Sequence, residues 1–475
     1  MGGILKKIRS MPQGAKASIA FFIASLITKG IGYITTPFFT RLLSSEEFGQ
    51  VSVYLTWVQV FGIIAMFCLS YGVFNNGMVD FPEQRDEYSF SMLMLSNLIT
   101  LCFSGIILAL YPIISPWLDM DLPLLILMCV IFLFQPAYNF WTAKQRYELK
   151  YKWTVIWTVL SSLLSPTIAI ICILLSDQNK LYARLFGAEV VLIIIYVFFY
   201  FHLGFKAKWK VNVGFWKSAL LFNLPLIPHY LSTYLLGSSN KLLISEIIND
   251  NAAAYYSVAY SVAAVVTIIW TSINTTLIPF TYEHCKEKNY KPISNITLPI
   301  LGVFAVASVF LIMLAPELVA IMATAEYMEA IYVIPPTIGG IFFQVQYYIY
   351  ANIIYYYKKP KYVMIASITA TVMNLVLNYI FISKFGYLAA GYVTMGCYLL
   401  QATIDYFAMK KVVGERVYNM RLIGLLSLGV LAVALLSNLI YDYMWIRYTI
   451  IAGILILAIL FRNKIIALLK AIKTR

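Results

Sequence analysis

The sequence predicts an all-α polytopic membrane protein, because its composition, its apolar runs and the placement of its basic residues agree. Of the 475 residues, 61% are hydrophobic and 12% are charged, whereas soluble domains contain about 25% charged residues. The apolar residues form runs of about 20, the length at which a helix crosses the hydrocarbon core of a bilayer. Short polar segments separate the runs, and they leave no room for a soluble domain.

Fourteen apolar runs are long enough to be membrane spans. Their expected ranges are 17–40, 49–73, 89–113, 122–141, 153–175, 181–203, 215–238, 252–280, 293–315, 329–354, 362–382, 386–407, 420–440 and 444–461. The first run is too long for a signal peptide and lacks a small-residue cleavage site, so we expect it to stay in the membrane. Spans 1–6 would form an N-terminal lobe (1–214) and spans 7–12 a C-terminal lobe (215–419), followed by two further helices and a basic tail (420–475).

The basic residues alternate between successive loops. With a cytoplasmic N-terminus, 28 of the 35 Lys and Arg residues fall in cytoplasmic segments, as the positive-inside rule requires. Six others, including Arg41 and Lys241, fall on the outer side, and Lys29 lies within the first span. The alternation predicts that both termini are cytoplasmic. It also attributes the net charge of +14 to membrane topology rather than to nucleic-acid binding.

The sequence lacks the motifs of several catalytic classes. Its six cysteines and three histidines do not have the spacing of a metal site or a disulfide framework. It contains no glycine-rich phosphate-binding loop and no segment long enough for a nucleotidase domain. No set of Ser, His and Asp side chains falls at one membrane depth. We therefore expect a protein that is not an enzyme and that uses no metal or other cofactor.

A six-residue pattern recurs at the outer ends of the first and seventh spans. Residues 41–46 (RLLSSE) and 241–246 (KLLISE) share a base, two leucines, a serine and a glutamate. Six spans separate the copies, so both enter the membrane in the same direction. Parallel repeats of this kind are common in transporters, and they predict two pseudo-symmetric six-helix lobes around a central cavity. Chance similarity is the alternative interpretation.

Polar residues follow one face of three expected spans. Lys29 lies in the middle of the first span, on a face with Ser25, Tyr33 and Thr36. At the same helical spacing, spans ten and eleven carry polar faces formed by Gln344, Tyr348, Asn352, Ser367, Thr371, Asn374 and Asn378. Because unpaired polar groups in hydrocarbon are costly, these faces are expected to line a wet interior. Structural pairing of Lys29, and amide bonds that only join helices, are the alternatives.

Several blocks of sequence are similar to one family of transporters along almost the whole chain. They are PFFTRLLSSEEFG at 37–49, LPLIPH at 224–229, SVAY at 257–260, EYMEA at 326–330, YYYKKP at 355–360 and FGYLAA at 385–390. With these blocks, and with Asn374 and Asn378, the chain resembles the Wzx-type polysaccharide lipid flippases, which export O-antigen and capsule units within the MOP superfamily. At one position it departs from that pattern: many relatives have an acid before the base of span seven, where this chain has Asn240.

The resemblance implies a MATE/MOP-like fold and a transport function. Undecaprenyl-diphosphate-linked oligosaccharide units would move from the cytoplasmic to the outer leaflet of the bacterial inner membrane. The two lobes would give alternating access to a cationic central cavity. The implied partners are this lipid, the membrane lipids and polysaccharide polymerase or assembly proteins, without nucleic acid.

The expected binding residues follow from the chemistry of such a substrate. A diphosphate is an anion, and sugar hydroxyls cannot enter hydrocarbon without hydrogen-bond partners. The residues expected to bind the diphosphate are Lys29, Arg41 and Lys241. The residues expected to bind the sugars are Gln344, Tyr348, Asn352, Asn374 and Asn378.

Three other functions remain open. A MATE-like multidrug/cation antiporter needs a buried carboxylate, and the acids in or near the spans are Glu189, Glu246 and Asp405. None of these lies in mid-span beside Lys29, which disfavours a cationic cargo. The charged residues of the sequence do not distinguish a polysaccharide lipid flippase from a flippase for the lipid-linked peptidoglycan precursor. A membrane-embedded glycosyltransferase would need a paired-carboxylate loop, for which the short outer loops leave no room.

Overall fold

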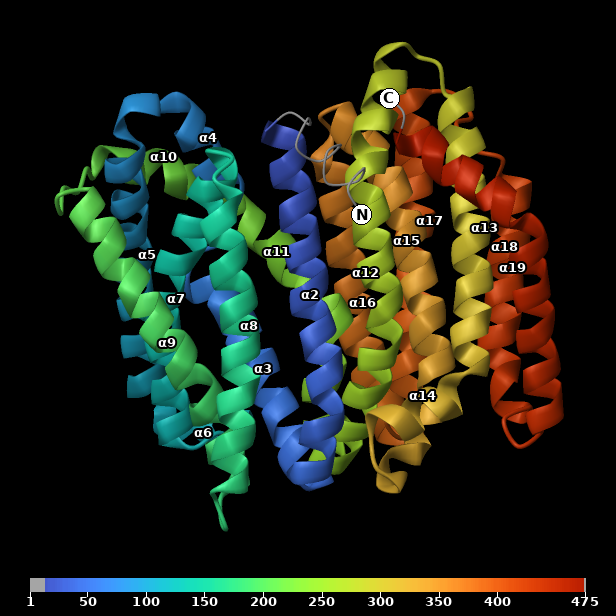
Figure 1. Cartoon of the computed structure of the whole chain (residues 1–475), viewed down its shortest axis with the longest axis horizontal. Helices are drawn as coiled ribbons and strands as arrows, with labels where there is room; N and C mark the ends of the chain where they lie inside the picture. Colours follow the sequence, from blue (N-terminus) through green and yellow to red (C-terminus); the bar gives the residue numbers. More distant parts are fainter. Residues whose placement is uncertain (1–12, 474–475) are drawn as a thin grey trace, which may run out of the picture. The chain divides into compact units, whose positions relative to one another are not determined.

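The computed structural model describes residues 13–473, and all regular elements within this range are helices (Figure 1). Four bases of the expected cytoplasmic ends, Lys6, Lys7, Arg9 and Arg475, lie outside the described residues. The helices are α2 (Gln13–Leu42), α3 (Ser45–Ala65), α4 (Gly72–Asp80), η1 (Pro82–Gln84), α5 (Arg85–Ala109), α6 (Tyr111–Leu118), α7 (Leu122–Tyr147), α8 (Tyr151–Leu174), α9 (Lys180–Lys206), α10 (Gly214–Asn223), η2 (Leu224–Leu226), α11 (Ile227–Ile247), α12 (Asp250–Lys286), α13 (Lys291–Met313), α14 (Ala315–Met322), η3 (Ala325–Tyr332), α15 (Ile334–Tyr356), α16 (Pro360–Phe385), α17 (Leu388–Val413), α18 (Met420–Leu436), η4 (Ser437–Leu439) and α19 (Met444–Lys473).

The chain divides into two compact units, Met1–Leu231 and Ser232–Arg475. The point of division lies inside α11, in the helix that the sequence assigns to span seven. In the second unit, α18 packs against α13 and α15, and α19 packs against α13. The three-part division at 214/215 and 419/420 stays a prediction.

Helices occupy all fourteen ranges in which the sequence predicts membrane spans. Ten helices of the described chain are long and apolar enough to cross a membrane, and a bent pair, Ala325–Tyr332 with Ile334–Tyr356, would make eleven. The other three predicted spans correspond to α2, α17 and α19, whose crossing of the membrane stays a prediction. The chain is therefore a multi-pass, all-helical membrane protein, and fourteen is its expected number of spans.

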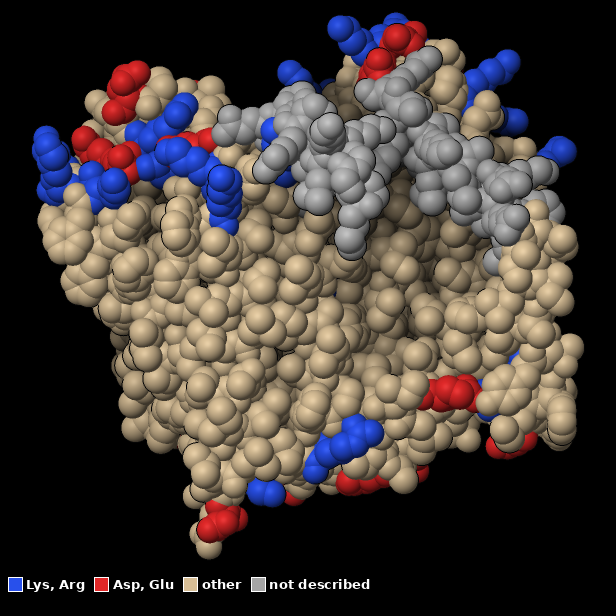
Figure 2. Space-filling view, in the orientation of Figure 1, with Lys and Arg blue, Asp and Glu red and all other residues tan. Residues whose placement is uncertain are grey.

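The surface of each unit has the distribution of charge that a membrane requires. On the face shown in Figure 2, Lys, Arg, Asp and Glu gather at the two ends of the helices, and the surface between the ends is uncharged. Many large apolar side chains are exposed, among them Leu175 at 81% and Trp445 at 87%. Soluble monomers rarely expose apolar patches of this extent, so contact with lipid accounts for this surface.

Prolines mark the places where two spans bend. Between α10 and α11, Pro225 lies in the short 3₁₀ turn Leu224–Leu226 and Pro228 opens α11. The helix pair η3 and α15 is bent by 50° next to Pro335 and Pro336. Proline removes a backbone donor and clashes with the preceding turn, which bends a helix.

The two copies of the repeated pattern have different local structures. In the first copy, Ser44 caps α3: its hydroxyl accepts from the Glu47 N–H, and the Glu47 carboxylate accepts from the Ser44 N–H. In the second copy, Ser245 lies in the last turn of α11, and the Asn249 side chain caps α12 by accepting from the Ala252 N–H. Both copies thus lie where one helix ends and the next begins.

Helix α15 is the centre of the second unit. Nineteen of its residues are buried, and it packs against α12, α13, α17 and α18. Helix α17 lies beside it along much of its length (Figure 1) and also packs against α16. The predicted site residues of α15 face helices α12 and α17, whereas Gln346 donates to Ser427 of α18 at 2.8 Å.

Candidate functional site

Lys241 of α11 lies against an aromatic ring of α12. Its Nζ is 5.3 Å from the centre of the Tyr260 ring, within the range of a cation–π interaction. Both residues are half-buried, and Lys241 forms no ion pair with an acid in the described part of the chain. The positive charge of Lys241 is thus held by an aromatic face and is not neutralised.

The predicted site residues of α15 make contacts with two neighbouring helices. Gln344 donates from Nε2 to the Tyr398 hydroxyl of α17 at 3.1 Å. The Tyr348 ring stacks on Trp270 of α12, with 6.2 Å between the ring centres.

One turn further along α15, Asn352 donates from Nδ2 to Oδ1 of Asn274 in α12 at 2.8 Å. Gln344 and Tyr348 are half-buried, whereas Asn352 is almost completely buried. The face of α15 thus passes from partly accessible groups to a buried amide, whose partner Asn274 is half-buried.

A glycine of α11 brings these groups close to Lys241. A Cβ atom at Gly237 would lie 3.2 Å from the Tyr398 hydroxyl and 3.6 Å from the Tyr260 hydroxyl, so both phenols approach the α11 backbone. Tyr398 also accepts from Gln344, and Tyr348 interacts electrostatically with Tyr260 and Tyr398. The residues Lys241, Tyr260, Gln344, Tyr348 and Tyr398 therefore form one group, which we call the Lys241 surface. It combines a cation, aromatic rings and an amide.

Asn374 and Asn378 of α16 lie in a buried hydrogen-bond network. Asn378 donates to Asn240 of α11 at 2.7 Å, Asn240 donates to Thr394 of α17 at 2.7 Å, and Asn374 donates to the same Thr394 hydroxyl at 3.0 Å. All three asparagines are fully buried. In this conformation the network joins α11, α16 and α17, and direct contact of these amides with a sugar stays a prediction.

The two predicted bases of the first unit lie on α2. Lys29 is exposed, as are Ser25 and Gly32 on the same face, so the polar face of this helix is not packed inside the unit. Arg41 is also exposed, and its guanidinium donates to the Pro37 carbonyl at 2.8 Å. Twelve residues of helix separate the two bases, which corresponds to about 18 Å, so they cannot bind one phosphate group together.

Two sets of functional candidates were not among the predicted site residues. Asp405 of α17 is fully buried, and neither of its carboxylate oxygens has a hydrogen-bond partner among the residues that the structure describes. In the first unit, Gln135, Asn139 and Arg146 of α7 line a polar pocket. Their spacing of 4 and 7 residues is visible in the sequence, but Arg146 counts there only as a cytoplasmic charge.

Comparisons with known proteins identify relatives of this chain. A family model described as polysaccharide biosynthesis protein matches residues 15–284. The Lsg locus putative protein 1 of Haemophilus influenzae is 23% identical over 380 residues, which cover 75% of this chain and 88% of that protein.

Solved structures of two transporters share the fold. Lipid II flippase MurJ in an inward closed conformation aligns with a TM-score of 0.68 at 16% identity, over 94% of this chain and all of that one. An inward-facing multidrug resistance MATE family transporter of the MOP superfamily aligns with a TM-score of 0.62 at 12% identity, over 83% of this chain and 94% of that one. The matched family and fold are those of membrane transporters, not of catalytic enzymes.

Proposed function

The chain belongs to the polysaccharide biosynthesis protein family, and we propose that it flips undecaprenyl-diphosphate-linked oligosaccharide units across a bacterial inner membrane. The units would be those of an O-antigen, a capsule or a similar glycan, and they would move from the cytoplasmic to the outer leaflet. The two compact units would act as the lobes of an alternating-access transporter, with both termini in the cytoplasm.

The Lys241 surface is the observation that carries this proposal. An uncompensated ammonium attracts the diphosphate, the Tyr260 and Tyr348 rings offer flat faces to sugar rings, and the Gln344 amide both donates and accepts hydrogen bonds. Such a combination suits a cargo that is both anionic and rich in hydroxyls. Lys29 and Arg41, which are exposed on α2, would supply further positive charge in the first unit.

The membrane potential would favour transport in the proposed direction. With a negative cytoplasm, moving an anion outward gains about 2.3 kcal/mol per charge per 100 mV. A diphosphate would gain about twice that at two charges, so accumulation in the outer leaflet would need no ATP. Bases along the path would stabilise the anion where it leaves the lipid headgroups.

A cation antiporter is the second candidate, and Asp405 is the residue that favours it. Antiport of a cationic drug against protons or sodium needs a carboxylate that is shielded from water, and the Asp405 carboxylate is fully buried and has no hydrogen-bond donor within residues 13–473. The two candidates differ in what Asp405→Asn would do. In an antiporter, Asp405→Asn would abolish drug export and its dependence on the ion gradient. In the proposed flippase, the substitution that impairs transport would be at Lys241 and not at Asp405.

Deletion of the gene in its own host tests the proposed function. The deletion strain should lose its surface glycan and accumulate lipid-linked oligosaccharide that stays inaccessible to glycan-binding reagents until the cells are opened. The full chain expressed from a plasmid should restore display. Accumulation of the peptidoglycan precursor lipid instead would identify a flippase for that lipid, and drug sensitivity with normal glycan would identify an antiporter.

A further inference from the structure

The first unit contains a polar pocket between α3, α7 and the segment that follows α3. Its volume is about 210 Å³, and its polar lining consists of Gln59, Ser70, Tyr71, Gln135, Asn139 and Arg146. Val58 and Met66 add a small apolar part. All these residues belong to one compact unit, so the pocket, which we call the Arg146 pocket, is complete within it.

The α7 side of the pocket is a stripe along a single helix face. Gln135, Asn139, Thr142 and Arg146 are separated by 4, 3 and 4 residues, which places them above one another on an α-helix. The stripe interrupts an otherwise apolar segment that begins at Leu122. Polar side chains at these positions in a span are costly unless they face protein or water, and here Gln135, Asn139 and Arg146 line the pocket.

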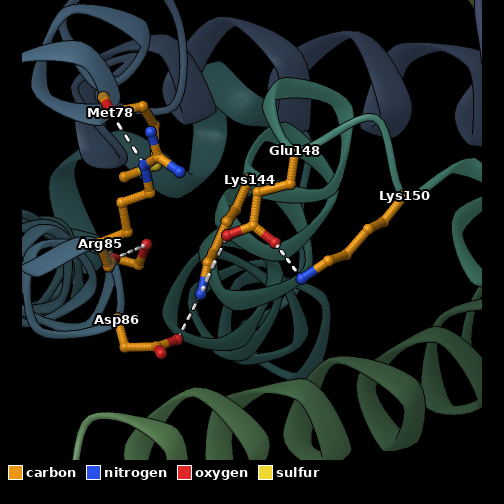
Figure 3. Close-up of polar contacts among 7 residues, drawn as sticks. Met78, Arg85, Asp86, Lys144, Glu148 and Lys150 are labelled. Atoms are coloured by element: carbon orange, nitrogen blue, oxygen red, sulfur yellow. Dashed lines mark hydrogen bonds and ion pairs between the residues drawn. The ribbon is translucent and has the colours of Figure 1, made fainter. Parts of the chain in front are cut away.

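The acids near Arg146 form ion pairs with lysines, which leaves Arg146 available to bind a ligand. Lys144 forms ion pairs with Asp86 and Glu148, and Lys150 binds the other oxygen of Glu148 at 2.6 Å (Figure 3). The nearby acids Asp86 and Glu148 are therefore occupied by lysines.

Arg85 is also held in place within the protein. It donates to the Met78 carbonyl at 3.1 Å (Figure 3) and lies over the Tyr147 ring. Arg146, in contrast, forms no ion pair with an acid in the described part of the chain, and its Nε makes a long contact of 3.4 Å with the Thr142 carbonyl. The guanidinium of Arg146 is exposed, so it can bind an anionic group such as a phosphate through two parallel N–H groups.

We propose that the Arg146 pocket binds the phosphate and the first sugar of the lipid-linked substrate at the predicted cytoplasmic end of the first unit. The inference rests on the proposed function and names residues outside the predicted site. Arg146 would bind phosphate oxygens through two parallel N–H groups, and Gln59 and Asn139 would bind sugar hydroxyls. Tyr71 would offer its ring, which Tyr230 supports edge-on at 5.5 Å.

Gln135 has a mixed role in this pocket. Its side chain interacts with the buried Tyr196 hydroxyl, so part of its hydrogen-bonding capacity is used within the unit. Its replacement would therefore disturb packing as well as binding. Asn139 and Arg146 are the better positions for a test, because in the described chain their side chains form no hydrogen bond to another helix.

Binding by the purified full chain in nanodiscs tests the pocket directly. The probes are farnesyl-diphosphoryl-glucose, which carries both phosphate and sugar, and inorganic pyrophosphate, which carries phosphate alone. We expect Arg146→Gln to weaken both probes at least about tenfold, equivalent to about 1.4 kcal/mol, and Arg146→Lys to retain part of the affinity. Asn139→Leu should weaken the sugar-bearing probe and leave pyrophosphate binding unchanged.

Matched controls separate the pocket from general effects on charge and folding. Lys152→Gln removes a base from the same predicted loop, and Gln145→Leu removes an amide from the same helix, but neither residue lines the pocket. Both variants should bind like the wild type. Equal affinity of Arg146→Gln and wild type for both probes, or no binding of either probe to the wild type, would overturn the proposal.

Glycan display in the deletion strain distinguishes failure of the pocket from failure of the proposed function. If the wild-type chain restores display and Arg146→Gln and Asn139→Leu restore it equally well at the same protein level, the pocket is wrong and the flippase assignment stands. If the wild-type chain restores no display and no lipid-linked oligosaccharide accumulates without it, the proposed function itself is wrong.

Discussion

The amide of Asn378 in α16 donates a hydrogen bond of 2.7 Å to Oδ1 of Asn240 in α11, and both residues are fully buried. Asn240 donates in turn to the Tyr256 and Thr394 hydroxyls. Asn240 is thus an amide that is bonded on both sides. This pair links the base-bearing helix α11 to α16, so its first consequence is for stability.

Removing either member of this pair should lower stability, and removing both should cost less than the sum. Asn240→Ala leaves Asn378 without its acceptor, and Asn378→Ala leaves Oδ1 of Asn240 without its donor. In membrane proteins such couplings average about 0.6 kcal/mol. Thermal unfolding of the detergent-solubilised single and double variants measures the coupling.

The same variants separate packing from sugar binding. Ser383→Ala is the control, because Ser383 is exposed on α16 and bonds to its own helix. If Asn374 and Asn378 only join helices, glycan display of their alanine variants should fall in proportion to the fall in Tm. Loss of display at an unchanged Tm would instead support direct contact of these amides with the oligosaccharide.

Charge reversal at Lys241 should be far more harmful than charge removal. Lys241 has a ring partner and no acidic partner among the described residues, so Lys241→Glu places repulsion where a phosphate would bind. At equal protein level, we expect the deletion strain to display most of the wild-type amount of glycan with Lys241→Arg, little with Lys241→Gln and none with Lys241→Glu. The same order is expected at Lys29.

A basic residue outside the proposed path controls for net charge. Lys384→Gln removes an exposed base at the end of α16 and should display glycan like the wild type. Equal display by Lys29→Gln and Lys29→Arg would remove Lys29 from the proposed path. Equal display by Lys241→Gln and Lys241→Arg would remove Lys241.

The long helices were predictable because each span is an apolar run of about 20 residues in the sequence. The short helices α4, α6 and α14 were not predicted, since eight or nine residues are too few to show a membrane-spanning run. The bends at Pro225 and Pro335 were visible as prolines, but the 50° angle depends on the helices that pack around them.

The contacts of the candidate site were less predictable than its residue types. Nineteen positions separate Lys241 from Tyr260, on two helices, and no local pattern relates them. The partner of Asn378 depends on the approach of α11 to α16. The spacing of the polar residues of α7 was visible in the sequence. Arg146 also agrees with the positive-inside rule, however, so the sequence analysis explained it as a cytoplasmic charge and not as a binding residue.

Acid should remove the contribution of a salt bridge at the predicted outer end of the second unit. Glu317 of α14 accepts two hydrogen bonds of 2.9 Å from the buried guanidinium of Arg447. Burial acts to raise the pKa of Glu317, but the hydrogen bonds from Arg447, from its own backbone and from the Tyr448 hydroxyl, together with the positive charge of Arg447, outweigh burial, and the pKa lies below its ordinary value. The stabilisation is therefore present above the unfolded pKa of about 4.3 and is lost as pH falls through the lower folded pKa.

Unfolding temperatures at two pH values measure this contribution. At about pH 6 Glu317→Gln should unfold at a lower temperature than the wild type, and at about pH 3 the difference should shrink. Asp442→Asn is the control, because Asp442 is exposed and forms no ion pair in the described chain. A constant difference between Glu317→Gln and wild type across this range would contradict the prediction.

The predicted topology places Glu326 outside and Lys359 inside, at the two ends of one bent span. Glu326 lies in η3 and Lys359 follows α15, and both are exposed. A membrane-impermeant maleimide added to whole cells should label Glu326→Cys above the background of the native cysteines, and should label Lys359→Cys only after the membrane is permeabilised. Labelling of Lys359→Cys in intact cells would show that the number of spans before it is not ten, and the assignment of the Arg146 pocket to the cytoplasmic side would then have to be tested separately.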